Sequence, residues 1–184
     1  MAKQELTKRL LADTLKKLCQ TRPLDKISVR EIAEAANSNR QTFYYHFKDK
    51  QSLICWIFDT DIAGVTDKNN NNTILDDIVE YFYSEREFYK AALASSVQNS
   101  LREHIFSLVR DRVLAQINEY ADDTFLSAKE TGVIASFFSH AAVGLLAEWA
   151  QSGMKPIFDD LSAEFWSITD NCLSYIVHQY AKHM

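Results

Sequence analysis

Glycine and proline are scarce in this chain, whose 184 residues include 4 Gly and 2 Pro. Folds made of many short strands need frequent turns, which these two residues favour, so the composition argues against an all-β protein. The three cysteines lie far apart in the sequence and form no Cys-x-x-Cys pair. This spacing argues against a disulfide framework or a zinc module, and we expect Cys19, Cys55 and Cys172 to be free thiols.

A long uninterrupted hydrophobic run is also lacking. The most apolar stretch, residues 133–150, is interrupted by Ser136, Ser139, His140 and Glu148, whereas a membrane-spanning helix needs about 20 predominantly apolar residues. The first residues carry charges every few positions and have no apolar core like that of a signal peptide. We therefore expect a cytoplasmic protein without a membrane partner, in which residues 133–150 form a buried helix.

Sequence patterns for catalysis or for metal binding are missing as well. The chain has no glycine-rich phosphate loop and no nucleophile elbow. Adjacent acids at 76–77, 122–123 and 159–160 stand at predicted helix starts, where carboxylates suit the helix dipole. The histidines form no convincing array with other metal ligands. We expect no enzyme activity, no cofactor and no metal.

What the sequence does contain is helical periodicity. Hydrophobic residues make up 47% and charged residues 24% of the chain, a balance typical of a globular protein rather than a disordered one. Apolar residues recur at helical spacing, so we predict an all-α protein of about nine helices. The predicted helices cover approximately residues 5–19, 28–36, 39–48, 50–66, 74–83, 85–95, 98–120, 127–152 and 160–182.

Charge is unevenly distributed along the chain. Residues 1–50 carry 11 Lys and Arg against 6 Asp and Glu, and residues 51–184 carry 9 against 19. The net charge of −5 therefore conceals a basic N-terminal part and an acidic remainder. Such a basic segment indicates contact with a polyanion such as nucleic acid, although a solvated charged helix without a partner explains the charge equally well.

Residues 28–48 have the pattern of a helix-turn-helix. Ser28 and Glu31 have the spacing of a capping box, which predicts that a helix starts there. The polar stretch 37–39 predicts a tight turn, because asparagine tolerates the left-handed conformation. Asn39, or the serine before it, can cap the helix that follows.

The second helix of such a motif reads DNA from the major groove. Phe43 and Phe47 are predicted to face the core, which leaves a basic, aromatic and amide-bearing outer face. Arg can donate two hydrogen bonds to guanine and Gln can pair with adenine, so Arg40 and Gln41 are the predicted base readers. Hydroxyl, imidazole and ammonium groups usually hold phosphates. The predicted phosphate contacts of this kind are Ser28, Thr42, Tyr44, Tyr45, His46, Lys48 and Lys50.

The segment from Ile27 to Leu53, ISVREIAEAANSNRQTFYYHFKDKQSL, resembles the DNA-binding signature of the tetracycline-repressor (TetR/AcrR) family of bacterial transcription regulators. Its most specific part is residues 42–50. There, family members place Thr, an aromatic residue or Leu, Tyr, a variable aromatic residue, His and Phe, and then a Lys at the start of the fourth helix. The chain departs from the family in the turn, where residues 37–39 read Asn-Ser-Asn in place of the usual Gly-Val-Ser.

The resemblance implies an all-helical homodimer with a DNA-reading head, a fourth helix that links it to a regulatory body, and two C-terminal helices per chain in a four-helix bundle. We accordingly predict a DNA-binding domain at residues 1–50, a linking helix at about 50–66, and a regulatory and dimerisation domain at 67–184. The resemblance implies phosphate contacts from Ser28, Tyr44, His46 and Lys50, and groove-facing positions for Arg30, Arg40, Gln41, Thr42 and Tyr45. The sequences at 86–90, 144–149 and 153–154 are similar to the regulatory domain of dihydroxyacetone kinase operon activators (the DhaS-like branch).

Two apolar stripes in the C-terminal half are predicted to supply the dimer interface, because self-association explains an apolar helix surface economically. Ordinary core packing must account for some of these residues. The predicted interface residues are Phe137, Phe138, Ala141, Leu145, Trp149, Phe165, Ile168, Cys172, Tyr175 and Ile176. The residues predicted to line an effector pocket are Tyr89, His104, Phe106 and His140, with satisfied core or surface positions as the alternative for the histidines.

These observations predict a TetR-type transcriptional regulator that binds a near-palindromic double-stranded DNA operator as a homodimer. A small-molecule effector or a protein partner is expected to control it at the C-terminal domain. The alternative is a partner-dependent co-regulator whose own DNA binding is weak. The altered turn at 37–39, together with the undefined effector pocket, keeps this alternative open.

Overall fold

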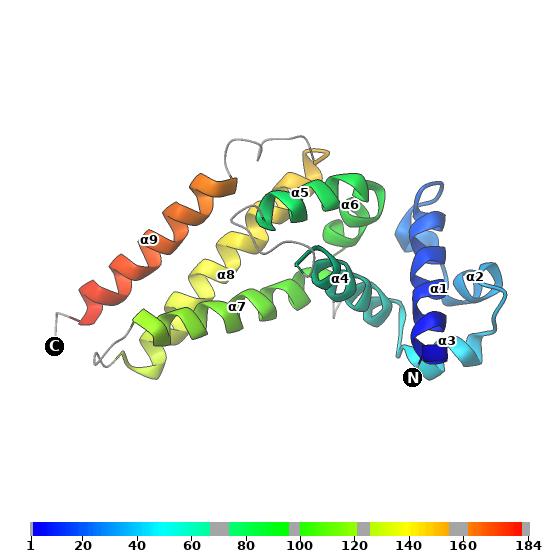
Figure 1. Ribbon diagram of the computed structural model, residues 1–184, viewed down its shortest axis with the longest axis horizontal. Coiled ribbons are helices and arrows are strands. Elements are labelled where there is room, and N and C mark those ends of the chain that lie inside the picture. The colour runs from blue at the N-terminus through cyan, green and yellow to red at the C-terminus, as the bar shows by residue number, and fades with distance from the viewer. Residues whose placement is uncertain (1, 67–73, 96–99, 121–125, 155–161, 182–184) are drawn as a thin grey trace.

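The computed structural model of the protein describes residues 2–66, 74–95, 100–120, 126–154 and 162–181. Within these ranges the chain forms nine α-helices and one short 3-10 helix, and it contains no strand (Figure 1). The predicted all-α fold is therefore confirmed.

The helices follow the predicted segments closely. Their bounds are α1 Ala2–Cys19, α2 Val29–Ala35, α3 Arg40–His46, α4 Lys50–Thr66, α5 Ile74–Ser84, α6 Arg86–Ala94, α7 Leu101–Tyr120, α8 Ala128–Gln151 and α9 Ser162–Ala181. The 3-10 helix η1, Leu24–Lys26, was not predicted, because three residues are too few to show helical periodicity. It follows Pro23, whose φ of −58° already suits a helical turn.

The first three helices lie together at one end of the molecule (Figure 1). Helix α4 leads from them into the remaining helices, where α7 and α8 pack along one another and α9 lies beyond them. Helix α1 packs not only on α2, α3 and α4 but also on α6, and η1 packs on α6 as well. The N-terminal helices therefore contact the rest of the molecule at more than one place.

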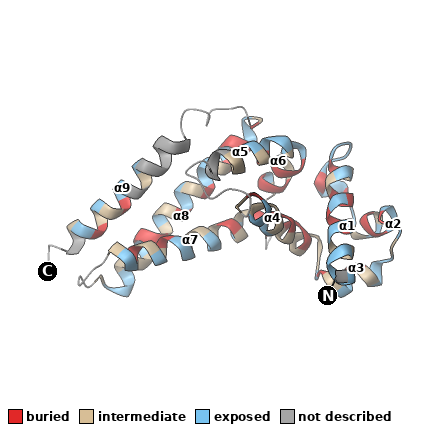
Figure 2. Ribbon diagram, viewed as in Figure 1, coloured by how far each residue is buried: buried red, intermediate tan, exposed pale blue. Residues whose placement is uncertain are grey.

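One apolar cluster runs from the N-terminal helices into the rest of the molecule (Figure 2). It joins Leu11 and Leu15 of α1 to Phe43 of α3, and it continues through Ile57 of α4 to Phe88 of α6. A second cluster lies among α7, α8 and α9 and consists of Val113, Ile117, Ile134, Ala135, Leu173 and Val177. Because apolar burial is the dominant favourable contribution to folding, a shared core holds the N-terminal helices against the body.

Helix α8 is buried along one face only, so the prediction of a buried helix holds for that face and not for the other. Its inner face supplies Ala135 and Val143 to the two core clusters, while Val133 and Phe137 remain 62% and 65% exposed. By length and composition α8 is the one helix in the described part of the chain that would suffice to cross a membrane. In the structure it packs against α6 and α7.

The end of α8 agrees with the predicted helix end at about residue 152, and Gly153 follows directly after it. Gly153 and Met154 have φ values of 91° and 54°, in the left-handed region that ends helices. The amide of Met154 donates to the carbonyl of Trp149 at 3.0 Å and so closes the last turn. The acids at 159–160, which were expected at the start of the next helix, lie outside the described residues.

The cysteines are free, as predicted. Burial raises the pKa of the Cys19 and Cys55 thiols to about 11, so both stay protonated at neutral pH. Cys172 is exposed on α9.

Candidate nucleic-acid interface

The start of α2 is fixed by the predicted capping box. The Ser28 hydroxyl accepts a hydrogen bond from the Glu31 amide at 3.2 Å, and the Glu31 carboxylate accepts from the Ser28 amide at 2.8 Å. Arg22, which comes from the segment after α1, donates to the same carboxylate at 2.6 Å. The Ser28 amide and hydroxyl together with the Arg22 guanidinium hold the pKa of Glu31 at about 2, below its ordinary value of 4.5.

The turn between α2 and α3 survives the loss of the family's glycine. Asn37 has a φ of 50°, the left-handed conformation that the sequence predicted for it. The Ser38 amide donates to the Ala33 carbonyl at 2.9 Å and closes the turn. Asn39 then caps α3, since its side-chain oxygen accepts from the Thr42 amide at 2.8 Å. Two asparagines thus supply the backbone conformation and the cap that the motif needs.

Helix α3 has one buried face and one exposed face. Phe43 and the residue after the helix, Phe47, are 0% and 5% exposed and anchor its inner side in the core. Tyr44 and Tyr45 are 49% and 71% exposed on the outer side. Arg40, Gln41 and Lys48 are exposed too, while Thr42 and His46 are half-buried. The structure therefore gathers the predicted DNA contacts of this helix on one surface.

Several of these side chains are already held in place without DNA. The Arg40 guanidinium lies 6.0 Å from the centre of the Tyr44 ring. The Tyr45 hydroxyl accepts from Gln4 of α1 at 3.0 Å, and the Thr42 hydroxyl donates to the Asn39 side chain at 3.1 Å. Ordered side chains lose less conformational entropy when they bind a partner.

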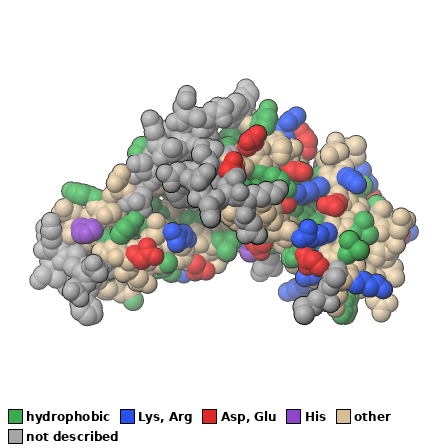
Figure 3. Space-filling view, viewed as in Figure 1, with side chains coloured by type: hydrophobic (Ala, Val, Ile, Leu, Met, Phe, Trp, Pro, Cys, Tyr) green, Lys and Arg blue, Asp and Glu red, His purple; other side chains and the backbone are tan. Residues whose placement is uncertain are grey.

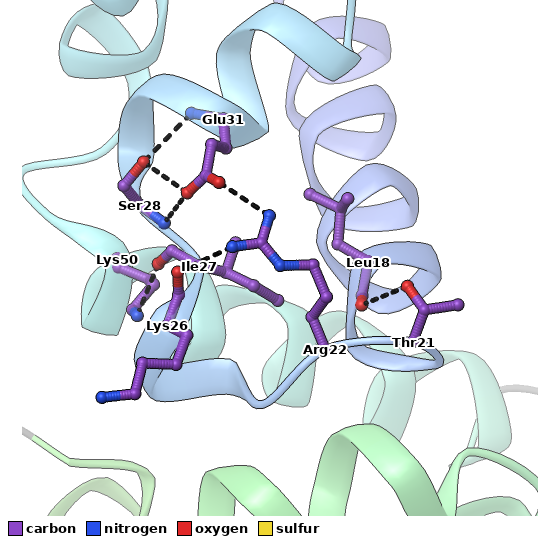
Figure 4. A network of polar contacts seen from close by, with 8 residues as sticks. All are labelled: Leu18, Thr21, Arg22, Lys26, Ile27, Ser28, Glu31 and Lys50. Atoms are coloured by element: carbon purple, nitrogen blue, oxygen red, sulfur yellow. Dashed lines mark hydrogen bonds and ion pairs between the residues drawn. The ribbon is translucent and has the colours of Figure 1, made fainter.

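Two predicted contacts on the neighbouring helices have partners within the chain. Exposed Arg30 of α2 pairs with Glu34 at 2.7 Å. The Lys50 ammonium, at the start of α4, donates to the carbonyl oxygen of Ile27 at 2.8 Å (Figure 4). It also donates to the carbonyl oxygen of Leu24 at 2.6 Å. Lys50 is half-buried, and this burial lowers its pKa. Two of its three N–H donors thus hold the segment around η1, and its contact with phosphate stays a prediction.

Arg22 is a residue that sequence reasoning missed. Besides its bond to Glu31 it donates to the Lys26 carbonyl at 3.2 Å, so it ties the segment around η1 to the start of α2 (Figure 4). No periodic pattern marks such a residue, because its partners are a backbone carbonyl and a side chain nine positions away.

Lys and Arg side chains are most visible over the N-terminal helices, where acidic side chains accompany them (Figure 3).

The predicted dimer stripes are mostly exposed. Phe137 and Leu145 of α8 and Ile168 and Tyr175 of α9 are 65%, 39%, 58% and 66% exposed, and Ala141 and Cys172 are exposed as well. Trp149 is a correction, because it is 3% exposed and belongs to the chain's own core. Phe138 and Ile176 are half-buried against the second core cluster. The side chain of Phe165 lies outside the described part of the structure.

The four predicted pocket residues do not come together. Phe106 and His140 line a cavity of about 370 Å³ with their ring centres 4.7 Å apart. His104 instead pairs with Asp59 of α4 at 2.7 Å. Tyr89 is a correction, since it is fully buried and its hydroxyl donates to Asp61 of α4. The other residues that line the cavity are Ser95, Ser100, Arg102, Glu103 and Val143.

The fold and this surface define an all-helical DNA-binding regulator of the helix-turn-helix class. Residues 11–54 match the bacterial regulatory proteins of the tetR family, and residues 69–171 match a transcriptional regulator C-terminal region that is found in the same family. The chain belongs to the tetR family. It is a transcriptional regulator with a DNA-binding N-terminal region, and not an enzyme.

Individual relatives agree with the predicted branch of the family. The HTH-type dhaKLM operon transcriptional activator DhaS of Lactococcus lactis subsp. lactis (strain IL1403) is 28% identical over 123 residues, which cover 64% of this chain and 63% of the relative. The match thus spans less than two thirds of that relative's length.

Two solved structures share the fold. The dihydroxyacetone kinase operon activator DhaS has a TM-score of 0.57 and 20% identity over 97% of both chains. Native NalD, the secondary repressor of the MexAB-OprM multidrug efflux pump in Pseudomonas aeruginosa, has a TM-score of 0.50 and 15% identity over 96% of both chains.

Proposed function

We propose that this protein binds a near-palindromic operator as a homodimer and that a ligand or partner at its C-terminal domain controls the binding. The observation that carries the proposal is the outer surface of α3. It exposes Arg40, Gln41, Tyr44 and Tyr45 on a helix whose inner side is anchored in the core. A rigid helix that presents such side chains suits the major groove.

The exposed groups divide by chemistry into base readers and phosphate contacts. Arg40 and Gln41, at the start of α3, read base edges, and Thr42, Tyr45 and Arg30 face the groove. Ser28, Tyr44, His46 and Lys48 hold phosphates. Lys50 contributes mainly through its two bonds to the carbonyls of η1, and its remaining N–H is available to a phosphate.

The homodimer rests on the exposed apolar faces of α8 and α9. Exposed apolar side chains on neighbouring helices are candidates for an interaction site. Val133 and Phe137 are exposed on α8, and Ile168 and Tyr175 are exposed on α9. Pairing these faces with their counterparts in a second chain buries them and creates a two-fold axis. The two α3 helices must then lie about 34 to 36 Å apart, or a multiple of that, to reach successive major grooves.

The site of control is proposed at the cavity that Phe106 and His140 line. Arg102, Glu103 and His140 offer polar contacts there, and Phe106 and Val143 offer apolar ones that a small molecule can use. An effector can bind dimers with one distance between the two DNA-reading heads more tightly than dimers with another, and it then shifts the population of dimers that can bind DNA. Helix α4 transmits this change from the C-terminal domain to the heads. We place this action in the bacterial cytoplasm, on the promoter of an operon, as for the dhaKLM operon activator DhaS.

The alternative, a partner-dependent co-regulator, rests on the altered turn and on the undefined effector pocket. Asn37 adopts the left-handed conformation and Asn39 caps α3, so the turn no longer argues for weak DNA binding.

Selection of binding sites from a random DNA pool by the purified full-length protein tests the proposal. The expected result is an enriched motif of two inverted half-sites whose centres are separated by about one helical turn or a multiple of it. A pool with no enriched motif after repeated selection would contradict direct sequence-specific binding.

A further inference from the structure

Four polar side chains from four helices meet between the N-terminal helices and the body. Lys16 of α1 donates to Asp61 of α4 at 2.8 Å and to the hydroxyl of Tyr81 of α5 at 3.0 Å. Tyr81 and Tyr89, the latter from α6, each donate their hydroxyl hydrogen to the Asp61 carboxylate. We call these residues, Lys16, Asp61, Tyr81 and Tyr89, the Asp61 cluster.

The Asp61 cluster is largely buried, and its main polar groups are bonded. The Lys16 and Asp61 side chains are each 13% exposed. The Lys16 ammonium also lies 5.2 and 5.9 Å from the ring centres of Tyr81 and Phe88. Although burial acts to lower the pKa of Lys16, its bonds to Asp61 and Tyr81 raise it above the ordinary value. Burial raises the pKa of both Tyr89 and Tyr81, so their phenols stay neutral at neutral pH.

The Asp61 cluster restricts the orientation of α1 relative to the body more strictly than the apolar core around it does. Apolar contacts are non-directional and tolerate small rotations, whereas a buried ion pair is destabilising as soon as one charge loses its partner. Lys16 belongs to the helix that carries Leu11 and Leu15 into the same core cluster as Phe43 of α3. A rotation of α1–α3 on the body would therefore pull Lys16 away from Asp61.

We infer that the Asp61 cluster sets the angle of the DNA-reading helices on the body, and thereby the half-site spacing that the dimer accepts. Lys16 and Asp61 are in this sense positioning residues for DNA recognition, since neither lies on the exposed face of α3. The inference rests on the proposed homodimeric operator binding and adds to it the residues that select the spacing.

The test compares full-length wild-type protein with Asp61→Asn, Lys16→Met and the milder Tyr81→Phe. The matched control is Asp59→Asn, which removes a carboxylate from the same helix outside the cluster, where it pairs with His104 of the body. Affinities are measured on operators with identical half-sites and spacers of native length or one or two base pairs longer or shorter. Thermal unfolding shows that each variant is folded.

Wild type and Asp59→Asn are expected to lose about tenfold or more in affinity on the altered spacers, because the second head no longer meets its groove. Asp61→Asn and Lys16→Met should bind the native spacer more weakly and differ by less than about threefold among spacers, with the base preference within a half-site unchanged. A wild-type spacing profile in these variants overturns the inference. If both fail to fold, the profile of Tyr81→Phe decides in the same way.

A second measurement needs no DNA and separates this inference from the proposed function. Spin labels at Lys48→Cys and Glu119→Cys, in a C55A/C172S background diluted with unlabelled protein, report the distance between the N-terminal helices and α7. The distribution should be broader or displaced when Asp61→Asn is added. Equal distributions refute the orienting role even if the operator is bound, and absence of specific binding by wild type refutes the proposed function instead.

Discussion

The Lys50 ammonium donates a hydrogen bond to the Ile27 carbonyl oxygen, 2.8 Å away and immediately before the Ser28 cap of α2. This bond joins the start of α4 to the start of the helix-turn-helix, and a second bond from the same ammonium reaches Leu24 at 2.6 Å. The side chain that begins the linking helix therefore also fixes the entry into the DNA-reading motif.

Replacing Lys50 with Met should destabilise the free protein by about 1 to 3 kcal/mol, because two charge-assisted bonds to half-buried carbonyls are lost. Lys48→Met is the matched control, since Lys48 is exposed. The Lys48→Met variant should keep the melting temperature of wild type. The slope of its log affinity against log salt concentration should be smaller by about 1, the value for one lost phosphate contact. Equal salt effects from both variants, with no loss of stability for Lys50→Met, would assign Lys50 to phosphate binding.

Arg40 is expected to read a base edge. Its guanidinium is held 6.0 Å from the Tyr44 ring centre, at the first position of α3. Arg40→Ala should cost about 1 to 3 kcal/mol in operator binding and relax the preference at one base position of each half-site. Binding to a set of operators with single-base changes measures both effects. Arg112→Ala, an exposed arginine on α7, should alter neither, and a uniform loss across all operators with Arg40→Ala would make Arg40 a phosphate contact.

The turn at Asn37 offers a matched pair of variants. Because Asn37 has a φ of 50°, Asn37→Ala should reduce the free energy of unfolding by about 1 kcal/mol, whereas Asn37→Gly should change it by less than about 0.5 kcal/mol. Chemical denaturation measures the difference. Should the two variants prove equally stable, the left-handed conformation of this residue would be in doubt.

Most of this site was predictable because its determinants are local in sequence. The capping box of Ser28, the left-handed Asn37 and the cap from Asn39 follow from side-chain chemistry acting over three or four residues. The Ser127 capping box of α8 has the same spacing and was within reach of the same reasoning. In contrast, the bond from Lys16 to Asp61 spans 45 positions, and no periodicity brings such residues together.

Burial was the harder property to predict for the C-terminal helices. Trp149 and Phe137 lie on the same apolar helix, yet the first is 3% and the second 65% exposed. Their difference depends on how α8 is rotated against α6 and α7, which the sequence pattern alone leaves open when a helix is apolar nearly all round. The wrong assignment of Trp149 to the dimer interface has this cause.

The pH dependence of stability should report the Glu31 network. The pKa of Glu31 is lowered from 4.5 to about 2, so its stabilising contribution is present above pH 4.5 and is lost as the pH falls toward 2. Wild type should be more stable than Glu31→Gln at pH 6, and the difference should shrink between pH 4.5 and 2. Thermal unfolding across this range measures it. A difference that stays constant with pH would mean that the charge of Glu31 is unimportant.

Dimerisation through α8 and α9 predicts that a charge on the exposed stripe separates the chains. Phe137 is 65% exposed, so Phe137→Glu should leave the fold of one chain intact while it converts dimer to monomer, as measured by light scattering after size exclusion. Leu108→Glu is the control, on a 44% exposed leucine of α7 outside the stripes. A dimer that withstands Phe137→Glu would move the interface elsewhere.

The central claim is that the protein recognises DNA without a partner. A binding titration of the purified wild-type protein on the DNA upstream of its own gene and of the neighbouring genes tests this claim. It is performed at two salt concentrations, with a scrambled sequence of equal length and with or without cell extract. The account predicts specific binding by the protein alone, weaker at high salt, with α3 as the reading helix. Equal affinity for the scrambled DNA, or binding that requires the extract, would contradict it.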